Sequence, residues 1–216
     1  MRLTVLAVAA AALSLPAVAS AGNFDGIYGG AQIGGAFTSL EKTNTSPIYS
    51  GGGDKNDSLS ANGVVGGVFA GYGYVLPYNI FVAAEIDATF GGRDYSETIS
   101  DPTNPYQSKI KTGTEWGMSF RPGYVINEHA LVYGLFGFER TPLKSTSTAS
   151  EVTFDKTQTA FRLGLGTEIS IYGPLTFRAD YVHTFLDDIT FGDSFGTSTT
   201  IKPSEDKFKL GVAYHF

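Results

Sequence analysis

From residue 22 onward, apolar and polar side chains alternate along the chain in a series of short segments. The clearest segments are Ile80–Phe90, Lys109–Phe120, Ala160–Ile171, Leu175–Phe185 and Lys207–Phe216. In each of them, one set of alternate positions is apolar, whereas the other set carries glycines, hydroxyls and isolated charges. Successive side chains of a β-strand point to opposite faces, so this period of two predicts strands with one apolar and one polar face.

Three further segments alternate less clearly, because glycine occupies positions on both faces. They are Ile27–Ser39, Gly63–Val75 and Ala130–Thr141. Together with the five clearer segments they give eight predicted strands, each close to the length that a tilted strand needs to cross a bilayer. No segment after residue 22 shows a clean helical period. The chain is therefore predicted to be all-β.

The predicted connections alternate between short and long. Tight turns are expected at Pro77–Asn79, Asn127–His129 and Tyr172–Pro174. The remaining connections are long and polar, and they span Leu40–Asn62, Gly91–Ser108, Pro142–Asp155 and Asp187–Glu205. Short turns at one end and long loops at the other are typical of outer-membrane barrels. We predict an eight-stranded antiparallel up-and-down transmembrane β-barrel with short periplasmic turns and long extracellular loops.

The polarity of the two faces distinguishes a membrane barrel from a soluble one. A soluble lipocalin-like barrel places its apolar face inside. The lumen of an eight-stranded barrel has room only for side chains, which suits a face of glycine, hydroxyl and charge and leaves the apolar face for lipid. One predicted aromatic belt, near the short turns and the C-terminus, comprises Tyr74, Tyr78, Tyr124, Tyr172 and Phe216. A second predicted belt, near the long loops, comprises Phe37, Phe90, Phe138, Phe185 and Phe191.

The first 21 residues differ from the rest of the chain and are predicted to be a secretory signal peptide. Arg2 supplies a positive charge, Leu3–Leu15 is apolar, and Ala19–Ala21 is a small-x-small cleavage site. We therefore expect a signal peptide over residues 1–21 and a β-barrel domain over residues 22–216. An exported chain without cysteine has no disulfide framework. The formal net charge of −6 disfavours a nucleic-acid-binding domain, so no nucleic-acid partner is expected.

The polar face of the predicted strands carries the charges that would line the lumen. They are Glu85, Asp87, Glu115, Arg121, Arg162, Glu168, Arg178, Asp180, Lys207 and Lys209. If the Tyr172–Pro174 turn sets the register, Glu168 and Arg178 lie opposite each other, where an ion pair would satisfy both charges. The network has two interpretations: a salt-bridged plug that fills the lumen, or a narrow, gated or proton-active pore. The narrow lumen favours the plug, because inward charges have no other place to lie.

Signatures of catalysis are missing from the sequence. It has three histidines, no cysteine, and no HExxH, GxSxG or Cys/His cluster. His183 alone lies where a lipid-facing catalyst could act. A lipid A deacylase would need a serine two residues further along, where this chain has Phe185, and Thr184 points inward. His183 is therefore interpreted as an interfacial side chain, and we expect no enzymatic activity, no cofactor and no metal site.

Three segments carry a resemblance to a known family. Phe208–Phe216 resembles the final strand of outer-membrane barrels, whose alternating apolar residues and terminal aromatic are read by the barrel-assembly machinery. Phe24–Gly34 and Gly66–Tyr74 are similar to the first two strands of small porin-family proteins with the outer-membrane β-barrel domain, which have an OmpA-like fold. The resemblance makes the expected assembly signal Phe208, Leu210, Val212, Tyr214 and Phe216.

The same resemblance implies a location and partners. It places the protein in the cell outer membrane of a Gram-negative bacterium, after cleavage of the signal peptide. The implied partners are outer-membrane lipid, lipopolysaccharide, the barrel-assembly machinery and periplasmic chaperones.

Pattern and resemblance together predict a non-enzymatic surface protein that contributes to envelope integrity. Its four long loops would be available for contact with a host or a small-molecule ligand. Two alternatives stay open at this point, a small low-conductance porin and a loop-mediated binder of a ligand such as haem. A lipid A-modifying enzyme is a third alternative, and it lacks a nucleophile.

Overall fold

A computed structural model describes the backbone of residues 24–45, 57–91, 94–99, 106–127, 129–147, 153–187, 189–192 and 198–216. It describes the side chains of residues 24–39, 62–91, 113–127, 129–142, 157–187 and 203–216. The predicted signal peptide over residues 1–21 and the predicted domain start at residue 22 lie outside the described residues. Within the described part of the chain, no helix is long and apolar enough to cross a membrane.

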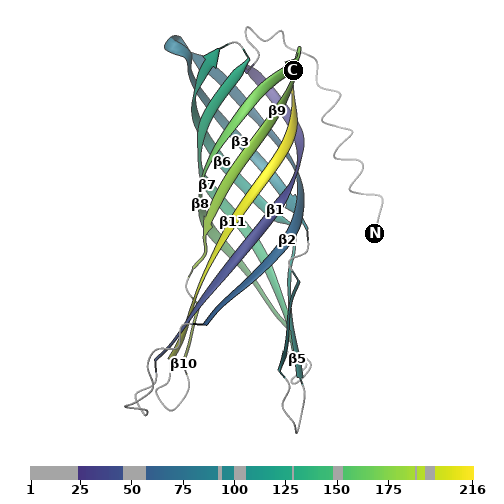
Figure 1. Ribbon diagram of the computed structural model, residues 1–216, viewed down its shortest axis with the longest axis vertical. Helices are drawn as coiled ribbons and strands as arrows, with labels where there is room; N and C mark the ends of the chain where they lie inside the picture. Colours follow the sequence, from purple (N-terminus) through teal and green to yellow (C-terminus); the bar gives the residue numbers. More distant parts are fainter. Residues whose placement is uncertain are drawn as a thin grey trace, which may run out of the picture.

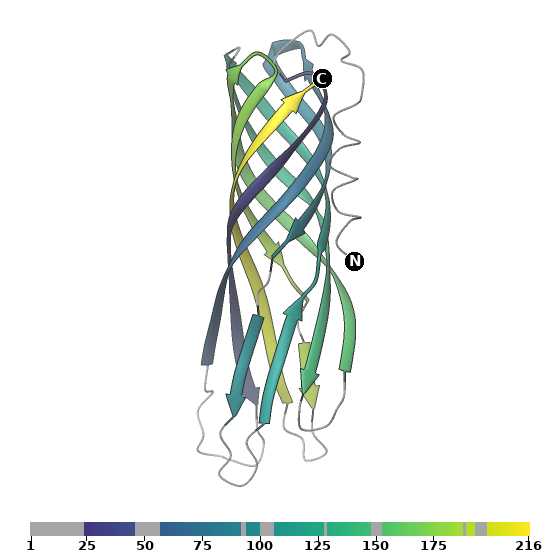
Figure 2. The same cartoon turned by 90° about the vertical axis from the view of Figure 1, so that its right-hand side faces the viewer.

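Eight strands form a closed antiparallel barrel (Figures 1 and 2). In order around the wall they are β1 (Gly26–Thr45), β2 (Asp57–Leu76), β3 (Ile80–Phe90), β6 (Glu115–Asn127), β7 (Ala130–Ser147), β8 (Thr153–Tyr172), β9 (Leu175–Phe185) and β11 (Ser198–His215). Pairing of β11 with β1 closes the sheet. A closed sheet keeps the backbone hydrogen bonds of the wall inside the protein, as a lipid environment requires. The predicted eight-stranded antiparallel barrel is confirmed.

The segments predicted as long loops contain strand, so those loop boundaries are wrong. β1 pairs with β11 as far as Thr45. Two further strands, β4 (Asp94–Ile99) and β10 (Ile189–Gly192), lie inside segments predicted as loops, and β5 (Tyr106–Thr112) begins in one and continues into the predicted strand Lys109–Phe120. Backbone hydrogen bonds alone can continue a ladder in water, where no face must be apolar. Alternation in the sequence therefore reports only the part of each strand that contacts lipid.

The segment Lys109–Phe120 is not one continuous strand as predicted. On the β7 side, Thr112 of β5 pairs with Leu143, and Trp116 of β6 pairs with Arg140. The ladder thus advances from 112 to 116 on one strand and only from 143 to 140 on the other. One extra residue is a β-bulge, which exchanges the two faces of a strand. From Trp116 onward the predicted apolar face is confirmed, because Trp116, Met118 and Phe120 are exposed on the wall; the side chains of residues 109–112 lie outside the described residues.

Tight turns join the strands at one end of the barrel, which we call the turn end and which lies at the top of Figure 1. Pro77–Asn79 forms the 3-10 turn η2, in which Tyr78 and Asn79 have φ angles of 67° and 63°. Such left-handed backbone is uncommon outside glycine. Gly173 supplies the same region, with φ 53°, between β8 and β9. After β6, the His129 N–H donates to Asn127 Oδ1 at 2.9 Å.

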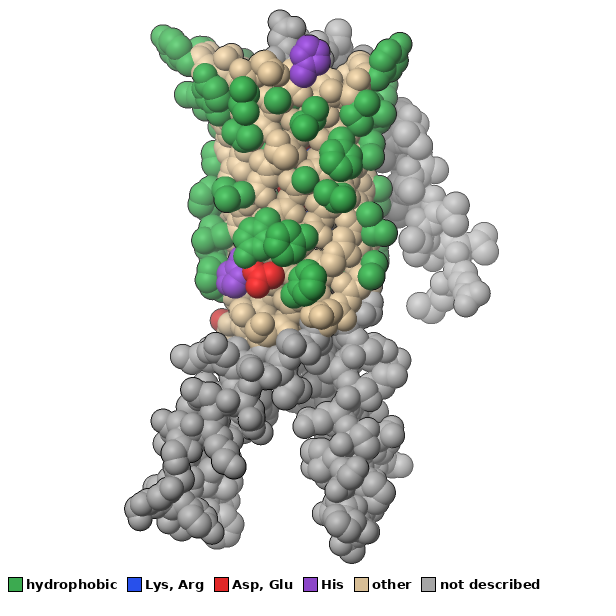
Figure 3. Space-filling view, in the orientation of Figure 1, with side chains coloured by type: hydrophobic (Ala, Val, Ile, Leu, Met, Phe, Trp, Pro, Cys, Tyr) green, Lys and Arg blue, Asp and Glu red, His purple; other side chains and the backbone are tan. Residues whose placement is uncertain are grey.

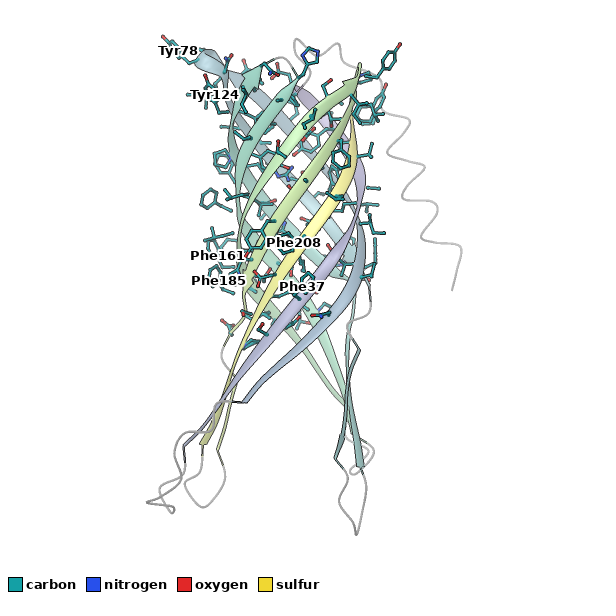
Figure 4. The ribbon with its side chains drawn as sticks, viewed as in Figure 1. Phe37, Tyr78, Tyr124, Phe161, Phe185 and Phe208 are labelled. Atoms are coloured by element: carbon teal, nitrogen blue, oxygen red, sulfur yellow. The ribbon has the colours of Figure 1, made fainter. Side chains whose placement is uncertain are left out.

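The outer wall is apolar and the lumen is polar. Burial alternates along β9, where every second side chain is buried and those between are half-buried or exposed, and the outward Leu165 of β8 is 69% exposed. Apolar side chains are spread over the wall in Figure 3, where no Lys or Arg side chain shows on this face of the described residues. Figure 4 shows Tyr78 and Tyr124 at the turn end, and Phe37, Phe161, Phe185 and Phe208 at the opposite end, which we call the loop end. Two aromatic zones thus bracket the apolar wall; the side chain of Phe191, also predicted there, lies outside the described residues.

Candidate functional site

Four charged side chains form a closed circuit of ion pairs in the lumen, toward the turn end. We call Glu85, Arg121, Arg178 and Asp180 the inner ring. Arg121 Nη1 lies 2.7 Å from Glu85 Oε2, and its Nη2 lies 3.1 Å from Asp180 Oδ1. Arg178 Nη1 lies 2.9 Å from Glu85 Oε2, and its Nη2 lies 2.7 Å from Asp180 Oδ2. Each arginine therefore contacts both carboxylates, which is how buried charges are made tolerable.

Aromatic side chains surround the inner ring and complete its hydrogen bonds. Tyr28 OH donates to Glu85 Oε2 at 3.0 Å, and Tyr133 OH donates to Asp180 Oδ1 at 2.5 Å. The two guanidinium groups lie over the rings of Tyr133 and Phe69, at 4.2 Å and 3.9 Å from the ring centroids. These cation–π contacts add to the ion pairs, and the aromatic shell lowers the local polarity that would weaken them.

Glycines opposite the large lumen side chains make room for the inner ring. A Cβ atom on Gly166 of β8 would overlap both the ring of Tyr133 and the carboxylate of Asp180. We expect Gly166→Val to lower the free energy of unfolding by about 1–3 kcal/mol, the usual cost of overpacking. Urea titration of the barrel in lipid vesicles measures this change. The outward variant Leu165→Val is the control, and equal stabilities of Gly166→Val and the wild type would contradict this packing.

A second set of charges lies toward the loop end. We call it the outer cluster, and it comprises Asp87, Glu115, Glu139, Arg162, Glu205 and Lys207. Arg162 forms a two-pronged ion pair with Asp87, one contact being Nη1 to Oδ2 at 3.1 Å. Glu139 joins the two cations of the cluster, since its carboxylate lies 3.4 Å from Arg162 Nη1 and 2.7 Å from Lys207 Nζ.

Lys207 lies among three carboxylates. Its Nζ is 2.5 Å from Glu115, 2.7 Å from Glu139 and 2.8 Å from Glu205. Carboxylate oxygens of these three residues all lie within 4.8 Å of one another. Three buried carboxylates at this spacing resemble the oxygen-ligand set of a hard cation. In this chain the ammonium group of Lys207 supplies the positive charge at that point.

The predicted Glu168–Arg178 ion pair is wrong, although the predicted register is right. The two residues pair directly across β8 and β9. Glu168 Oε1 lies 2.7 Å from His215 Nε2 and accepts a hydrogen bond from Thr176 Oγ1 at 2.6 Å. Arg178 reaches instead across the narrow lumen to Glu85 on β3, four strands away around the wall. Across such a lumen, a long side chain reaches the facing wall and finds a bidentate partner there.

Residues 5–216 match the outer membrane protein beta-barrel domain family. The chain belongs to this family. Two relatives are the 31 kDa outer-membrane immunogenic proteins of Brucella melitensis biotype 1 and Brucella suis biovar 1, each 29% identical over 197 residues. Those residues cover 88% of this chain and 79% of each relative. Crystalline OprG of Pseudomonas aeruginosa has the same fold, with a TM-score of 0.54, 13% identity, and coverage of 92% and 100% of the two chains.

Family membership confirms the predicted resemblance and the general location. This member of the outer membrane protein beta-barrel domain family is an outer-membrane β-barrel surface protein of a Gram-negative bacterium. The likeness to OprG concerns the fold alone.

The predicted lumen charges and the predicted assembly residues lie on opposite faces of the wall. Buried side chains in the lumen are Glu85, Asp87, Glu115, Arg121, Arg162, Glu168, Arg178 and Asp180. The predicted assembly residues that are exposed on the outer face of β11 are Phe208, Leu210, Val212 and Tyr214. Phe216 follows β11, and its amide donates to the Ile27 carbonyl at 2.8 Å. The roles of both sets, as a lumen network and as an assembly signal, stay predictions.

Sequence reasoning missed four lumen residues that complete these clusters. Glu139 and Tyr133 lie in a segment where glycine blurred the two faces, and Glu205 was assigned to a loop. The period of two along a strand could have located two of them. Glu205 lies two residues before Lys207 and so continues the inward series of Lys207 and Lys209, and Glu139 alternates with outward phenylalanines. Tyr28, the fourth, gave no signal, because its partner Glu85 lies on another strand.

Proposed function

We propose that this protein is a non-enzymatic, non-conducting surface barrel that contributes to envelope integrity and holds extracellular hairpins outward for contact with a ligand or host. The observation that carries the proposal is the inner ring. Its members come from β3, β6 and β9, and Tyr28 and Tyr133 add bonds from β1 and β7. Ion pairs that cross the lumen tie facing walls together, which favours a stiff, filled barrel over an open one.

The extension of the strands supports the surface part of the proposal. The β1–β2 and β1–β11 ladders continue to Lys42 and Thr45, beyond the aromatic zone marked by Phe37 (Figure 4). Paired strands beyond the bilayer place the starting points of their connecting segments away from the membrane surface. Such placement favours contact by connecting segments, which carry binding residues disproportionately in proteins.

The non-enzymatic part of the proposal rests on the surroundings of His183. Its Nδ1 lies 2.8 Å from Asp206 Oδ1, which resembles the base and orienting carboxylate of a hydrolase. The hydroxyl next to it in sequence, Thr184, is buried on the lumen side, and Phe185 packs against the imidazole with ring centroids 4.5 Å apart. A base without a nucleophile beside it does not make a covalent catalyst.

Planar-bilayer recording tests the closed barrel. We expect the refolded wild-type protein to give no steady single-channel current, because the inner ring occupies the lumen. Arg178→Gln removes one cation from the ring and is expected to raise the frequency of brief openings. Heat-modifiable migration on a gel verifies that each sample is folded. A steady wild-type current that changes in Arg178→Gln would contradict the proposal and favour a low-conductance pore.

Cells test the role in the envelope and at the surface. Deletion of the gene is expected to increase sensitivity to detergent, and the wild-type gene should restore resistance. A version with exchanged extracellular connections should restore it equally, because the barrel is unchanged, while surface binding to host material is lost. Unchanged detergent sensitivity after deletion would contradict the role in envelope integrity.

A further inference from the structure

Three polar side chains form a cluster on the membrane-facing side of the barrel, on the opposite face of the wall from the lumen network. Asp206 of β11 pairs in register with His183 of β9. Tyr181 OH donates to Asp206 Oδ1 at 2.6 Å, and His183 Nδ1 lies 2.8 Å from the same oxygen. The side chains of His183 and Asp206 are 29% and 34% exposed. We call these three residues the outward triad.

The outward triad lies inside the aromatic zone of the loop end. Tyr181 contacts Phe208 with ring centroids 4.9 Å apart, and His183 contacts Phe185 at 4.5 Å. Figure 4 shows Phe185 and Phe208 in this zone, and Figure 3 shows a histidine and an acidic side chain side by side among apolar ones there. Aromatic girdles of outer-membrane barrels mark the depth at which lipid headgroups meet the acyl chains. The triad is therefore at headgroup depth.

The imidazole of His183 has one nitrogen engaged by the protein and one turned away from it. Nδ1 faces Asp206, so Nε2, on the other side of the ring, is directed away from the carboxylate. Among the described residues, no group forms a hydrogen bond with Nε2. The hydroxyl hydrogen of Tyr181 is already donated to Asp206 and is not available to His183. A polar partner for Nε2 is therefore available from outside the protein, from the lipid headgroups and water of the interface.

We propose that the outward triad binds a phosphate monoester of an outer-leaflet lipid headgroup through His183. The bound histidine is an imidazolium: Nδ1–H donates to Asp206, and Nε2–H donates to a phosphate oxygen. The cation then lies between two anions, and both of its hydrogens form charge-assisted bonds. Asp206 holds the ring in this orientation, and Tyr181 holds Asp206. Phosphate is an anionic group of lipid headgroups at this depth in a membrane, and free phosphate offers the same chemistry from the aqueous side.

Native mass spectrometry of the detergent-solubilised full-length barrel tests the proposal with a bisphosphorylated glycolipid as the probe. We expect His183→Gln to retain this lipid about tenfold less than the wild type, the loss expected for one charge-assisted hydrogen bond. Glutamine preserves size and polarity, and heat-modifiable migration reports folding. His129→Gln changes an exposed histidine at the turn end; it is the matched control and should retain lipid like the wild type. Equal retention by His183→Gln and wild type would overturn the proposal.

The phosphate itself is tested with the same lipid after enzymatic removal of its phosphates. The wild type and His183→Gln should then retain equal, lower amounts, and a persistent difference would show that His183 recognises another part of the lipid, which overturns the proposal. NMR of the wild-type imidazole in nanodiscs gives a second readout that needs no variant. Both ring nitrogens should carry hydrogen when phosphorylated lipid is present. If both ring nitrogens carried hydrogen with inorganic phosphate but not with phosphorylated lipid, a lipid would be excluded as the source of the phosphate, which would overturn the proposal.

Discussion

Replacing Glu85 with glutamine lowers the free energy of unfolding by about 3–5 kcal/mol, the cost expected when one partner of a buried ion pair is removed. Glu85 is one of the two carboxylates that hold the inner ring together. It contacts Arg121 and Arg178 and accepts the hydroxyl of Tyr28. In the variant, both arginines depend on Asp180 alone, and two buried cations then repel each other across the lumen. The expected loss is therefore larger than for any outward substitution in the barrel.

Urea-induced unfolding in lipid vesicles, followed by tryptophan fluorescence of Trp116, measures this loss. Trp116 is the sole tryptophan and faces outward from β6, so its signal reports insertion of the wall. Asp187→Asn is the matched control, because it also neutralises one acid but at an exposed position. Its effect should stay within about 0.5 kcal/mol. A loss below 1 kcal/mol for Glu85→Gln, outside the usual range for a broken buried pair, would mean that the ring is not a structural plug.

Replacing Lys207 with methionine is expected to convert a stable barrel into one that depends on a divalent cation. Without the ammonium group, Glu115, Glu139 and Glu205 are three buried residues with carboxylate oxygens within 4.8 Å of one another, and Arg162 Nη1 lies 3.4 Å from Glu139. In the presence of EDTA, the free energy of unfolding should fall by about 3–5 kcal/mol. Calcium prefers clustered carboxylate oxygens, so at one hundred times its Kd it should restore about 2.7 kcal/mol.

The experiment compares urea unfolding in EDTA and in calcium for three proteins. The wild type should respond little, because Lys207 already supplies the positive charge. Lys209→Met is the matched control: it removes another buried lysine of β11, two residues away, whose side chain is not among the three carboxylates. It should lose stability without recovering it in calcium. A Lys207→Met barrel that is indifferent to calcium would show that the three carboxylates do not converge.

Prediction from the sequence succeeded where the membrane restricts the choice of residues. In β9, alternation assigned Phe177 and Tyr181 to lipid and Arg178 and Asp180 to the lumen, as the structure has them. The turn between β8 and β9 also gave the Glu168–Arg178 register. These successes have one cause: lipid admits only apolar outward side chains, so the two faces differ in composition.

Prediction failed where that restriction ends. Beyond the bilayer both faces of a strand meet water, so β4, β10 and the ends of the long strands left no alternation to read, and β5 was divided between a predicted loop and the predicted strand Lys109–Phe120. At Ala130–Thr141 glycine blurred the faces and hid Glu139, a member of the outer cluster.

The sequence by itself determined the strands that cross the membrane, their inward and outward faces, and the charges that must share the lumen, because these depend on a period of two and on the polarity of lipid. Only the tertiary structure decided which charges pair. Closure of the sheet brings β3 opposite β9, so Arg178 contacts Glu85 rather than its cross-strand neighbour Glu168. Closure also sets Asp206 beside His183 on the outer wall. Pairings across a closed lumen join residues far apart in the chain, and no local pattern encodes them.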